Sequence, residues 1–243
     1  MFDQIKHMKK IDLLSPNFSK KKRDRKYVKF VIIHYTGMQS EIESIKRLRD
    51  KKSKVSCHYL INRSGLIFKM VNENQIAWHA GKSKWKKFNN LNKYSIGIEL
   101  VNKGHKIGYQ NYSYPQIKTL IKLSSYLKKK YKIKTENFLG HSDIAPLRKI
   151  DPGEKFPWKK LSKFKIGYWF SEKNKNLKTY KSQDVYSQFF RNLHKIGYRY
   201  FSVKFRGKSD KYIIKAFQRK FCPKNVDGKI DKKTFKISQL LIK

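Results

Sequence analysis

The chain has 243 residues, 39% of them hydrophobic, and a formal net charge of +42. This length and apolar content suffice for one medium-sized domain and a small one. No apolar run approaches the ~18 residues that are needed to span a bilayer, and two cysteines, Cys57 and Cys222, are too few for a disulfide framework.

Lysine is spread along the whole chain and is not gathered into one stripe. The charge therefore predicts a general attraction to polyanions and no specific nucleic-acid site. Residues 1–6 lack the apolar stretch of a secretory signal. If Met1 is the native start, we expect a cytoplasmic protein, and the alternative is the periplasm or the cell envelope.

The first elements along the chain are an arm, a strand and a helix. Residues 1–26 are polar and rich in lysine, and we expect them to form a flexible basic arm. Residues 29–35 are short and β-branched, which predicts a buried strand. Residues 40–51 have helical apolar spacing, and Ser40 is suited to be the N-cap.

The pattern that follows alternates strands with helices. Residues 58–61 and 66–71 flank a glycine turn and predict a hairpin. Residues 96–101 predict another buried strand, residues 114–131 a long amphipathic helix, and residues 138–140 a short strand. We therefore expect an α/β domain with a mixed central sheet flanked by helices.

The regular pattern ends after about residue 165, so we place the catalytic domain at 27–165 and a linker at 166–180. Residues 181–243 contain three helical stretches and predict a small three-helix C-terminal domain, close to the lower size limit for independent folding. The predicted helices are 182–196, 209–221 and 232–241.

Three residues far apart in the chain could bind one metal ion. His34 and His141 each follow an apolar strand, and Asp151 precedes a Pro-Gly turn that holds its backbone rigid. Two histidines and one aspartate are a typical donor set of a hydrolytic zinc site, because three protein ligands leave the fourth position open for water. We therefore predict one Zn²⁺ ion. Asp143, two residues after His141, is the competing acid and could instead be a helix cap.

Two further residues have suitable chemistry beside such a metal. Glu99 closes a buried strand, where an acid is costly without a partner or a proton-transfer role, so we expect a general acid/base. A salt bridge to one of the many lysines is the alternative. Lys149 could stabilise an oxyanion, although an ordinary solvated lysine is the simpler interpretation. We expect Trp78, His79, Ala80 and Tyr35 to contact substrate, while a core Trp with a capped His explains the first three almost as well.

Several motifs occur together in one order. They are VIIHYT at 31–36, VSCHYLI at 55–61, AWHAG at 77–81, NKYSIGIE at 92–99, GHSD at 140–143 and KIDPG at 149–153. This set resembles the zinc-dependent N-acetylmuramoyl-L-alanine amidases of the type-2 family, which are related to T7-type lysozyme and to peptidoglycan-recognition proteins. The resemblance covers roughly residues 27–165.

The resemblance implies the roles of the site residues. His34, His141 and Asp151 would be zinc ligands, Glu99 the catalytic acid/base, and Lys149 a transition-state stabiliser. The implied reaction is hydrolysis of the amide between N-acetylmuramic acid and L-alanine of the stem peptide, in peptidoglycan turnover or recycling. Peptidoglycan or soluble (anhydro)muropeptides would be the partners, and we expect a monomer.

The C-terminal residues resemble a small helical peptidoglycan-binding module through AFQRKF at 216–221 and VDGKID at 226–231. The Gly-Pro that is usual after the Asp-Gly turn is replaced by Asp231 and Lys232, so packing alone is an open alternative for these helices. Two other classes of function are also open: a non-catalytic peptidoglycan receptor with the same fold, and a nucleic-acid-binding protein suggested by charge alone.

Overall fold

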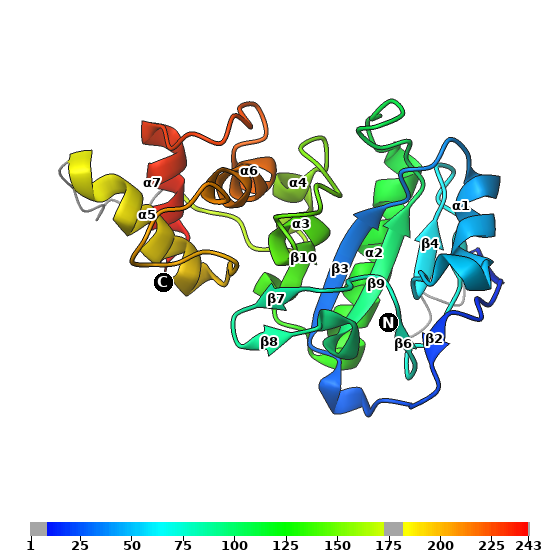
Figure 1. Cartoon of the computed structure of the whole chain (residues 1–243). Coiled ribbons are helices and arrows are strands. Elements are labelled where there is room, and N and C mark those ends of the chain that lie inside the picture. The colour runs from blue at the N-terminus through cyan, green and yellow to red at the C-terminus, as the bar shows by residue number, and fades with distance from the viewer. Residues whose placement is uncertain (1–8, 173–181, 243) are drawn as a thin grey trace.

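A six-stranded mixed sheet forms the centre of the computed structural model, which describes residues 9–172 and 182–242. The strand order is β1-β5-β4-β9-β3-β10 (Figure 1). Strands β4, β9, β3 and β10 run parallel to one another, and β5 runs antiparallel to β4. The strands are β1 (Lys10–Asp12), β3 (Phe30–Tyr35), β4 (Tyr59–Ile61), β5 (Ile67–Lys69), β9 (Ser95–Leu100) and β10 (Phe138–Gly140).

The central strands β3 and β9 are almost continuous apolar runs, as expected for parallel strands that are covered on both faces. Their register pairs His34 with Glu99. Both residues lie near the carboxyl end of a strand, and β10 ends immediately before His141. In open α/β sheets this edge is where ligands bind, so the topology brings the predicted site residues together.

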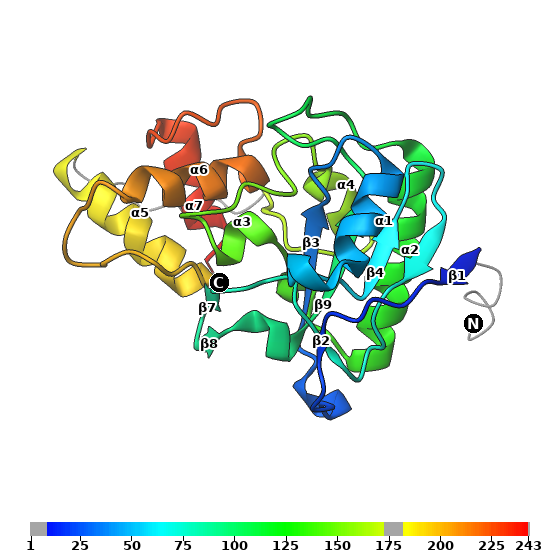
Figure 2. The same ribbon diagram turned by 45° about the vertical axis from the view of Figure 1, so that its right-hand side comes forward.

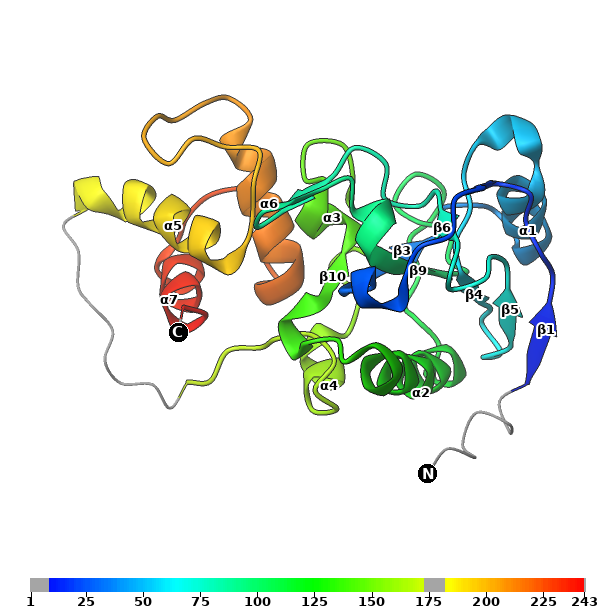
Figure 3. The same cartoon turned by 90° about the horizontal axis from the view of Figure 1, so that it is seen from below.

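Helices cover both faces of the sheet. Helix α2 (Tyr114–Tyr131) and helix α4 (Trp158–Ser162) pack on one face through Leu120, Leu123 and Leu161, and α1 (Glu41–Arg49) packs on the other through Leu48. Figure 3 shows α2 and α4 on the opposite side of the sheet from α1. The sequence therefore predicts the layered α/β class correctly.

The remaining elements are short. They are α3 (His141–Ile144), the pair β2 (Phe18–Ser19) and β6 (Ile76–Ala77), the pair β7 (Lys84–Trp85) and β8 (Phe88–Asn89), and the 3-10 turns η2 (Arg25–Tyr27), η3 (Lys51–Ser53), η4 (Leu91–Tyr94) and η5 (Thr135–Asn137).

The three predicted C-terminal helices are present as α5 (Ser182–Ile196), α6 (Asp210–Phe221) and α7 (Lys232–Leu240). They lie beside β10 and α3 in two views of the molecule (Figures 1 and 2). Their buried side chains form one apolar cluster with residues of the sheet and of α3. The helices therefore share a core with the sheet. The members of this shared core include Phe30, Ile32, Leu139 and Ile144 on the sheet side, and Phe189, Phe190, Tyr198, Phe217 and Phe221 on the helical side.

The expectation of a loose N-terminal arm is wrong for residues 9–26. Strand β1 pairs in parallel with β5, and β2 pairs with β6. The buried guanidinium of Arg23 donates hydrogen bonds to the carbonyls of Asn92 at 3.0 Å and Ser95 at 2.7 Å. Polar composition does not reveal such contacts, because an edge strand is held by backbone hydrogen bonds. Residues 1–8 lie outside the described part of the chain.

Several predicted boundaries agree with the structure. Helix α2 begins at Tyr114 with Pro115 in its first turn, and the Ser113 hydroxyl caps it by accepting from the Gln116 amide at 3.3 Å. Ser40 caps α1 by accepting from the Glu43 amide at 3.1 Å. Within the described ranges, no helix is both long and apolar enough to cross a membrane.

Candidate active site

Three side chains from three segments meet at the carboxyl end of the sheet. His34 is on β3, His141 is the first residue of α3, and Asp151 lies in the turn that follows. The Nδ1 atoms of the two histidines are 3.0 Å apart, and each lies 3.1 Å from Asp151 Oδ2. All three residues are buried, and they form a group that could hold a metal ion.

A buried chain of hydrogen bonds orients His34. Its Nε2 lies 3.0 Å from His79 Nδ1, His79 Nε2 lies 3.2 Å from Ser95 Oγ, and Ser95 Oγ lies 2.6 Å from the Leu91 carbonyl. A carbonyl can only accept, so Ser95 donates to Leu91 and accepts from His79. His79 Nδ1 must then accept from His34 Nε2, which leaves a lone pair on His34 Nδ1.

Gly97 explains how the His79 ring reaches this position. A Cβ at residue 97 would lie 2.4 Å from His79 Cγ, so any larger residue in this part of β9 would displace the ring. The two motifs AWHAG and SIGIE are therefore parts of one arrangement, in which a glycine on the strand makes room for a histidine from the preceding loop.

His141 is oriented from the same loop. Its Nε2 lies 3.1 Å from the Ala80 carbonyl, which can only accept, and 3.3 Å from the Arg148 guanidinium, which can only donate. The shorter contact to the carbonyl places the proton on Nε2 and leaves a lone pair on Nδ1. Arg148 holds this loop, because its guanidinium donates to the carbonyls of Ala80 and Lys82. The loop of residues 78–82 therefore orients both histidines.

The hydrogen-bond directions at His34 and His141 show whether a metal ion fits between them. With Nε2 protonated on both rings, no proton remains between the two Nδ1 atoms, and three lone-pair atoms face one another at 3.0–3.1 Å. Burial and nearby His141 together lower the pKa of His34 to about 4, so His34 does not place a second proton in the gap at neutral pH. Ligand atoms around a tetrahedral zinc ion lie about 3.3 Å apart, so the donor set and spacing fit such a cation.

Glu99 is the unpaired acid of the site. Its Oε2 is shielded from water and has no hydrogen-bond partner among the described residues. Burial and the negative charge of Asp151 raise the pKa of Glu99 to about 8, and Lys149 partly offsets their effect. A carboxyl with a pKa near neutrality, next to a group of residues that could hold a metal ion, can both accept and return a proton.

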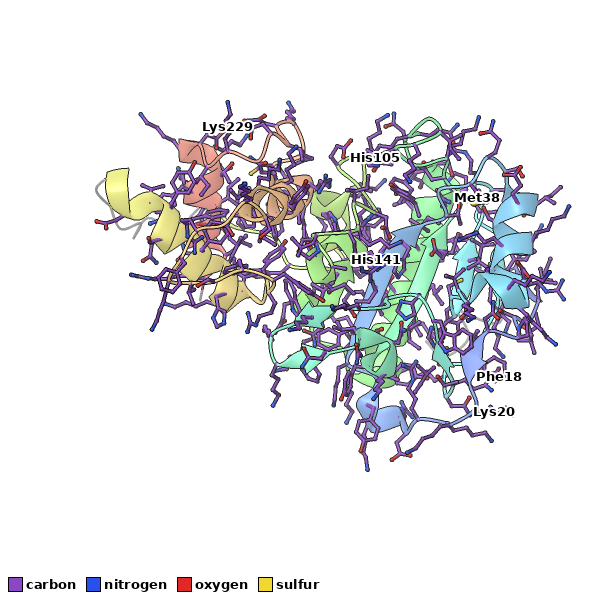
Figure 4. All side chains as sticks on the ribbon, viewed as in Figure 1. Phe18, Lys20, Met38, His105, His141 and Lys229 are labelled. Carbon is purple, nitrogen blue, oxygen red and sulfur yellow. The ribbon has the colours of Figure 1, made fainter. Side chains whose placement is uncertain are left out.

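These residues line one groove of about 380 Å³. Lys149 is on its wall together with Trp78 and Tyr35. Figure 4 shows His105 and Met38 on loops beyond the same end of the sheet, with His141 deeper in the molecule. The wall is rich in cations, which are Arg47, Lys103, Lys106, Arg148 and Lys149.

The structure separates the four residues that we expected to contact substrate. Trp78 is partly exposed, and its indole donates to Ser19 Oγ at 3.2 Å. Tyr35 bonds to His105 Nδ1 at 2.9 Å, and burial raises its pKa to about 12. His79 also borders the groove, but its ring nitrogens are bonded to His34 and Ser95, while Ala80 is fully buried with its carbonyl on His141.

Sequence reasoning missed Ser95, Arg148 and His105. Ser95 is the anchor of the chain that orients His34, and Arg148 holds the loop that orients both histidines. His105 showed no supporting context in the sequence, yet it bridges Tyr35 and Glu154 at the rim of the groove. The glycines at 104 and 108, which flank the loop after β9, were the one available sign of a shaped turn.

At the carboxyl edge of a mixed sheet, the site combines residues that could hold a metal ion with a carboxyl suited to proton transfer, an arrangement typical of hydrolases. A family model described as N-acetylmuramoyl-L-alanine amidase matches residues 23–154. The chain belongs to this amidase family.

Similar proteins support this assignment over most of the chain. The amidase AmiD of Escherichia coli K12 is 36% identical over 230 residues, which are 88% of this chain and 82% of AmiD. The 1,6-anhydro-N-acetylmuramyl-L-alanine amidase AmpD of Haemophilus influenzae is 41% identical over 108 residues, 44% of this chain and 56% of AmpD.

Two solved structures have the same fold. AmiD from E. coli, in complex with the substrate anhydro-N-acetylmuramic acid-L-Ala-D-γ-Glu-L-Lys, has a TM-score of 0.79 and 32% identity, and the match covers 92% of this chain and 91% of AmiD. AmpDh3 from Pseudomonas aeruginosa, in complex with anhydromuramic pentapeptide, has a TM-score of 0.78 and 30% identity, covering 91% of this chain and 93% of AmpDh3.

Proposed function

We propose that this chain hydrolyses the amide between the lactyl group of N-acetylmuramic acid and the L-alanine of the stem peptide, with one zinc ion held by His34, His141 and Asp151. The observation that carries the proposal is the convergence of three lone-pair atoms at 3.0–3.1 Å with no proton left to separate them. Family membership supports the choice of bond.

Bound zinc would polarise the lactyl carbonyl and lower the pKa of the attacking water. The Glu99 carboxylate takes a proton from that water and delivers it to the departing amine of L-alanine. The raised pKa of Glu99, about 8, suits both transfers, because the group binds and releases a proton near neutral pH. Lys149, on the same wall of the groove, stabilises the developing oxyanion.

We propose anhydromuropeptides as the substrate class. Two solved relatives of similar fold are complexes with such molecules. The cations on the groove wall suit a stem peptide, because its glutamate residue and its carboxyl end carry negative charge. In this proposal Trp78 and Tyr35 contact the substrate, whereas His79 and Ala80 act by orienting the two histidine ligands. We expect the monomer to be competent, because one chain supplies the three candidate ligands, Glu99 and Lys149.

The decisive experiment is mass spectrometry of the products from a purified anhydromuropeptide, with and without a zinc chelator. Free stem peptide should appear, disappear on chelation and return when zinc is added. Absence of cleavage by a folded, zinc-loaded sample, on both soluble fragments and intact wall, would contradict the proposal and favour a non-catalytic receptor. Binding of the uncleaved muropeptide by that sample would then identify the receptor directly.

A further inference from the structure

The carboxylate of Asp143 joins the C-terminal helices to the helix that carries His141. Asp143 is on α3, two residues after His141, and only 1% of it is exposed. Its Oδ1 accepts a hydrogen bond from the Tyr198 hydroxyl at 2.7 Å, and its Oδ2 accepts from Lys220 Nζ at 2.8 Å. Tyr198 follows α5 and Lys220 lies on α6, so two segments of the C-terminal region meet on one carboxylate.

The same carboxylate caps the short helix. Asp143 Oδ2 also accepts from the Gly140 amide at 2.8 Å, at the point where β10 ends and α3 begins. Helix α3 has only four residues, and a helix of this length has little stability of its own. Its position therefore depends on tertiary contacts, and those of Asp143 are a buried ion pair with Lys220 and a buried hydrogen bond from Tyr198.

Lys220 contacts the chain on both sides of His141. Besides its ion pair with Asp143, its ammonium group lies 3.3 Å from the Phe138 carbonyl of β10 and 4.2 Å from the centre of the Trp158 ring. The lysine is 5% exposed, so both its charge and that of Asp143 are buried between α6 and the sheet. Removing one member of such a buried pair leaves the other charge without compensation.

Helix α3 supports two of the three candidate metal ligands. His141 is its first residue, and the Ser142 amide donates to the Asp151 carbonyl at 2.9 Å. A shift of α3 would thus move His141 and Asp151 together relative to His34, which is on a central strand. We propose that Lys220 and Tyr198 are positioning residues of the metal centre, and that the C-terminal helices hold α3 through Asp143 so that His141 and Asp151 face His34. This inference rests on the proposed metal centre.

The proposal predicts that the protein loses metal affinity when the contacts of Lys220 or Tyr198 with Asp143 are removed, although neither residue is a ligand. In the full chain, freed of metal with a chelator, we expect Lys220→Met to raise the zinc dissociation constant about tenfold or more, measured by competition with a chromophoric chelator. We expect Tyr198→Phe, which keeps the ring in the core, to raise it by a smaller factor. The visible spectrum of the Co²⁺-loaded Lys220→Met protein should also differ from that of the wild type.

Ile237→Ala is the matched control, because Ile237 lies in the same core on α7 and makes no hydrogen bond to α3. It should lower the melting temperature and leave the zinc dissociation constant unchanged. The inference is overturned if Lys220→Met melts lower yet binds zinc like the wild type, or if Ile237→Ala weakens zinc binding equally. Should Lys220→Met not fold, the same comparison between Tyr198→Phe and Ile237→Ala decides.

The experiment separates this inference from the metal centre on which it rests. Wild-type protein should bind one zinc ion, and His34→Ala should lose that binding. If the wild type binds no zinc, the metal centre itself fails. If the wild type binds zinc and both variants at Lys220 and Tyr198 bind it equally well, only the role of the C-terminal helices fails.

Discussion

The two histidines of the site are held by different regions of the molecule. His34 lies on a central strand and is oriented through His79 and Ser95, which belong to the catalytic region. His141 lies on a four-residue helix whose Asp143 is bound by Tyr198 and Lys220 of the C-terminal region. One half of the site thus depends on motifs next to it in the fold, and the other on a segment that follows it by more than 50 residues.

The largest effect on turnover should come from a change at Glu99, which leaves the contacts that hold His34 and His141 intact. We expect Glu99→Gln to reduce turnover of an anhydromuropeptide about 10²- to 10⁴-fold, because the amide cannot take the proton of the attacking water. Zinc affinity should stay within a fewfold of the wild type, since Glu99 is not among the three ligands. Steady-state kinetics and zinc titration check both parts, and near-normal turnover would exclude Glu99 as the acid/base.

Removing the hydrogen bond that orients His34 tests whether His79 holds this ligand independently of the C-terminal region. His79→Phe removes the acceptor for His34 Nε2, and we expect zinc affinity to fall about 10- to 100-fold. His79→Gln keeps an acceptor in a side chain that can reach His34, and it is the matched control that should recover part of the affinity. Zinc binding by His79→Phe at the wild-type level would show that β3 alone orients His34.

The pH dependence of stability tests the environment of Glu99 without metal. Burial raises the pKa of Glu99 to about 8, above the value of about 4.3 that is ordinary for an unfolded chain. The folded state therefore favours protonated Glu99. The contribution of this group to the free energy of unfolding is fully present below about pH 4 and is lost as the pH rises towards 8. Glu99→Gln does not titrate. In chelator, we expect its stability advantage over the wild type to grow by about 1–3 kcal/mol between pH 5 and 8.5, partly reduced by solvent screening.

Denaturant unfolding of both proteins at the two pH values measures this difference. Glu73→Gln serves as a control for a carboxylate with charged partners, because Lys130 and two tyrosines hold the pKa of Glu73 below its ordinary value despite burial. Its stability difference from the wild type should not develop over the same pH range. A constant difference between Glu99→Gln and the wild type would mean that Glu99 is already ionised at pH 5.

The smallest effect on zinc affinity should come from Ser95, the last side chain in the chain of hydrogen bonds that orients His34. Ser95→Ala removes the acceptor of His79 Nε2 but leaves the ring between Gly97 and His34. We expect zinc affinity to fall by about fivefold, as for the loss of one neutral hydrogen bond of about 1 kcal/mol. An effect as large as that of His79→Phe would mean that Ser95, and not the ring of His79, controls the orientation of His34.

Local signals in the sequence predict most of the elements and the three residues that meet in the candidate metal site. Apolar runs that end in His34, Glu99 and His141 predict buried strands, and the carboxyl ends of parallel strands meet at one edge of a sheet. The helix at Tyr114–Tyr131 follows from apolar periodicity and a Ser-Tyr-Pro start, both of which are local signals.

The contacts that hold the site come from the tertiary structure. The residues that orient the ligands are separated from them by many positions: His79 is 45 residues from His34, and Lys220 is 77 residues from Asp143. Periodicity and capping describe neighbours along the chain, whereas the direction of a buried hydrogen bond depends on which acceptors the packing brings near it. For the same reason, the prediction of a flexible arm is wrong for residues 9–26, because the pairing of an edge strand leaves no mark in local composition. The core that the C-terminal helices share with the sheet leaves no such mark either.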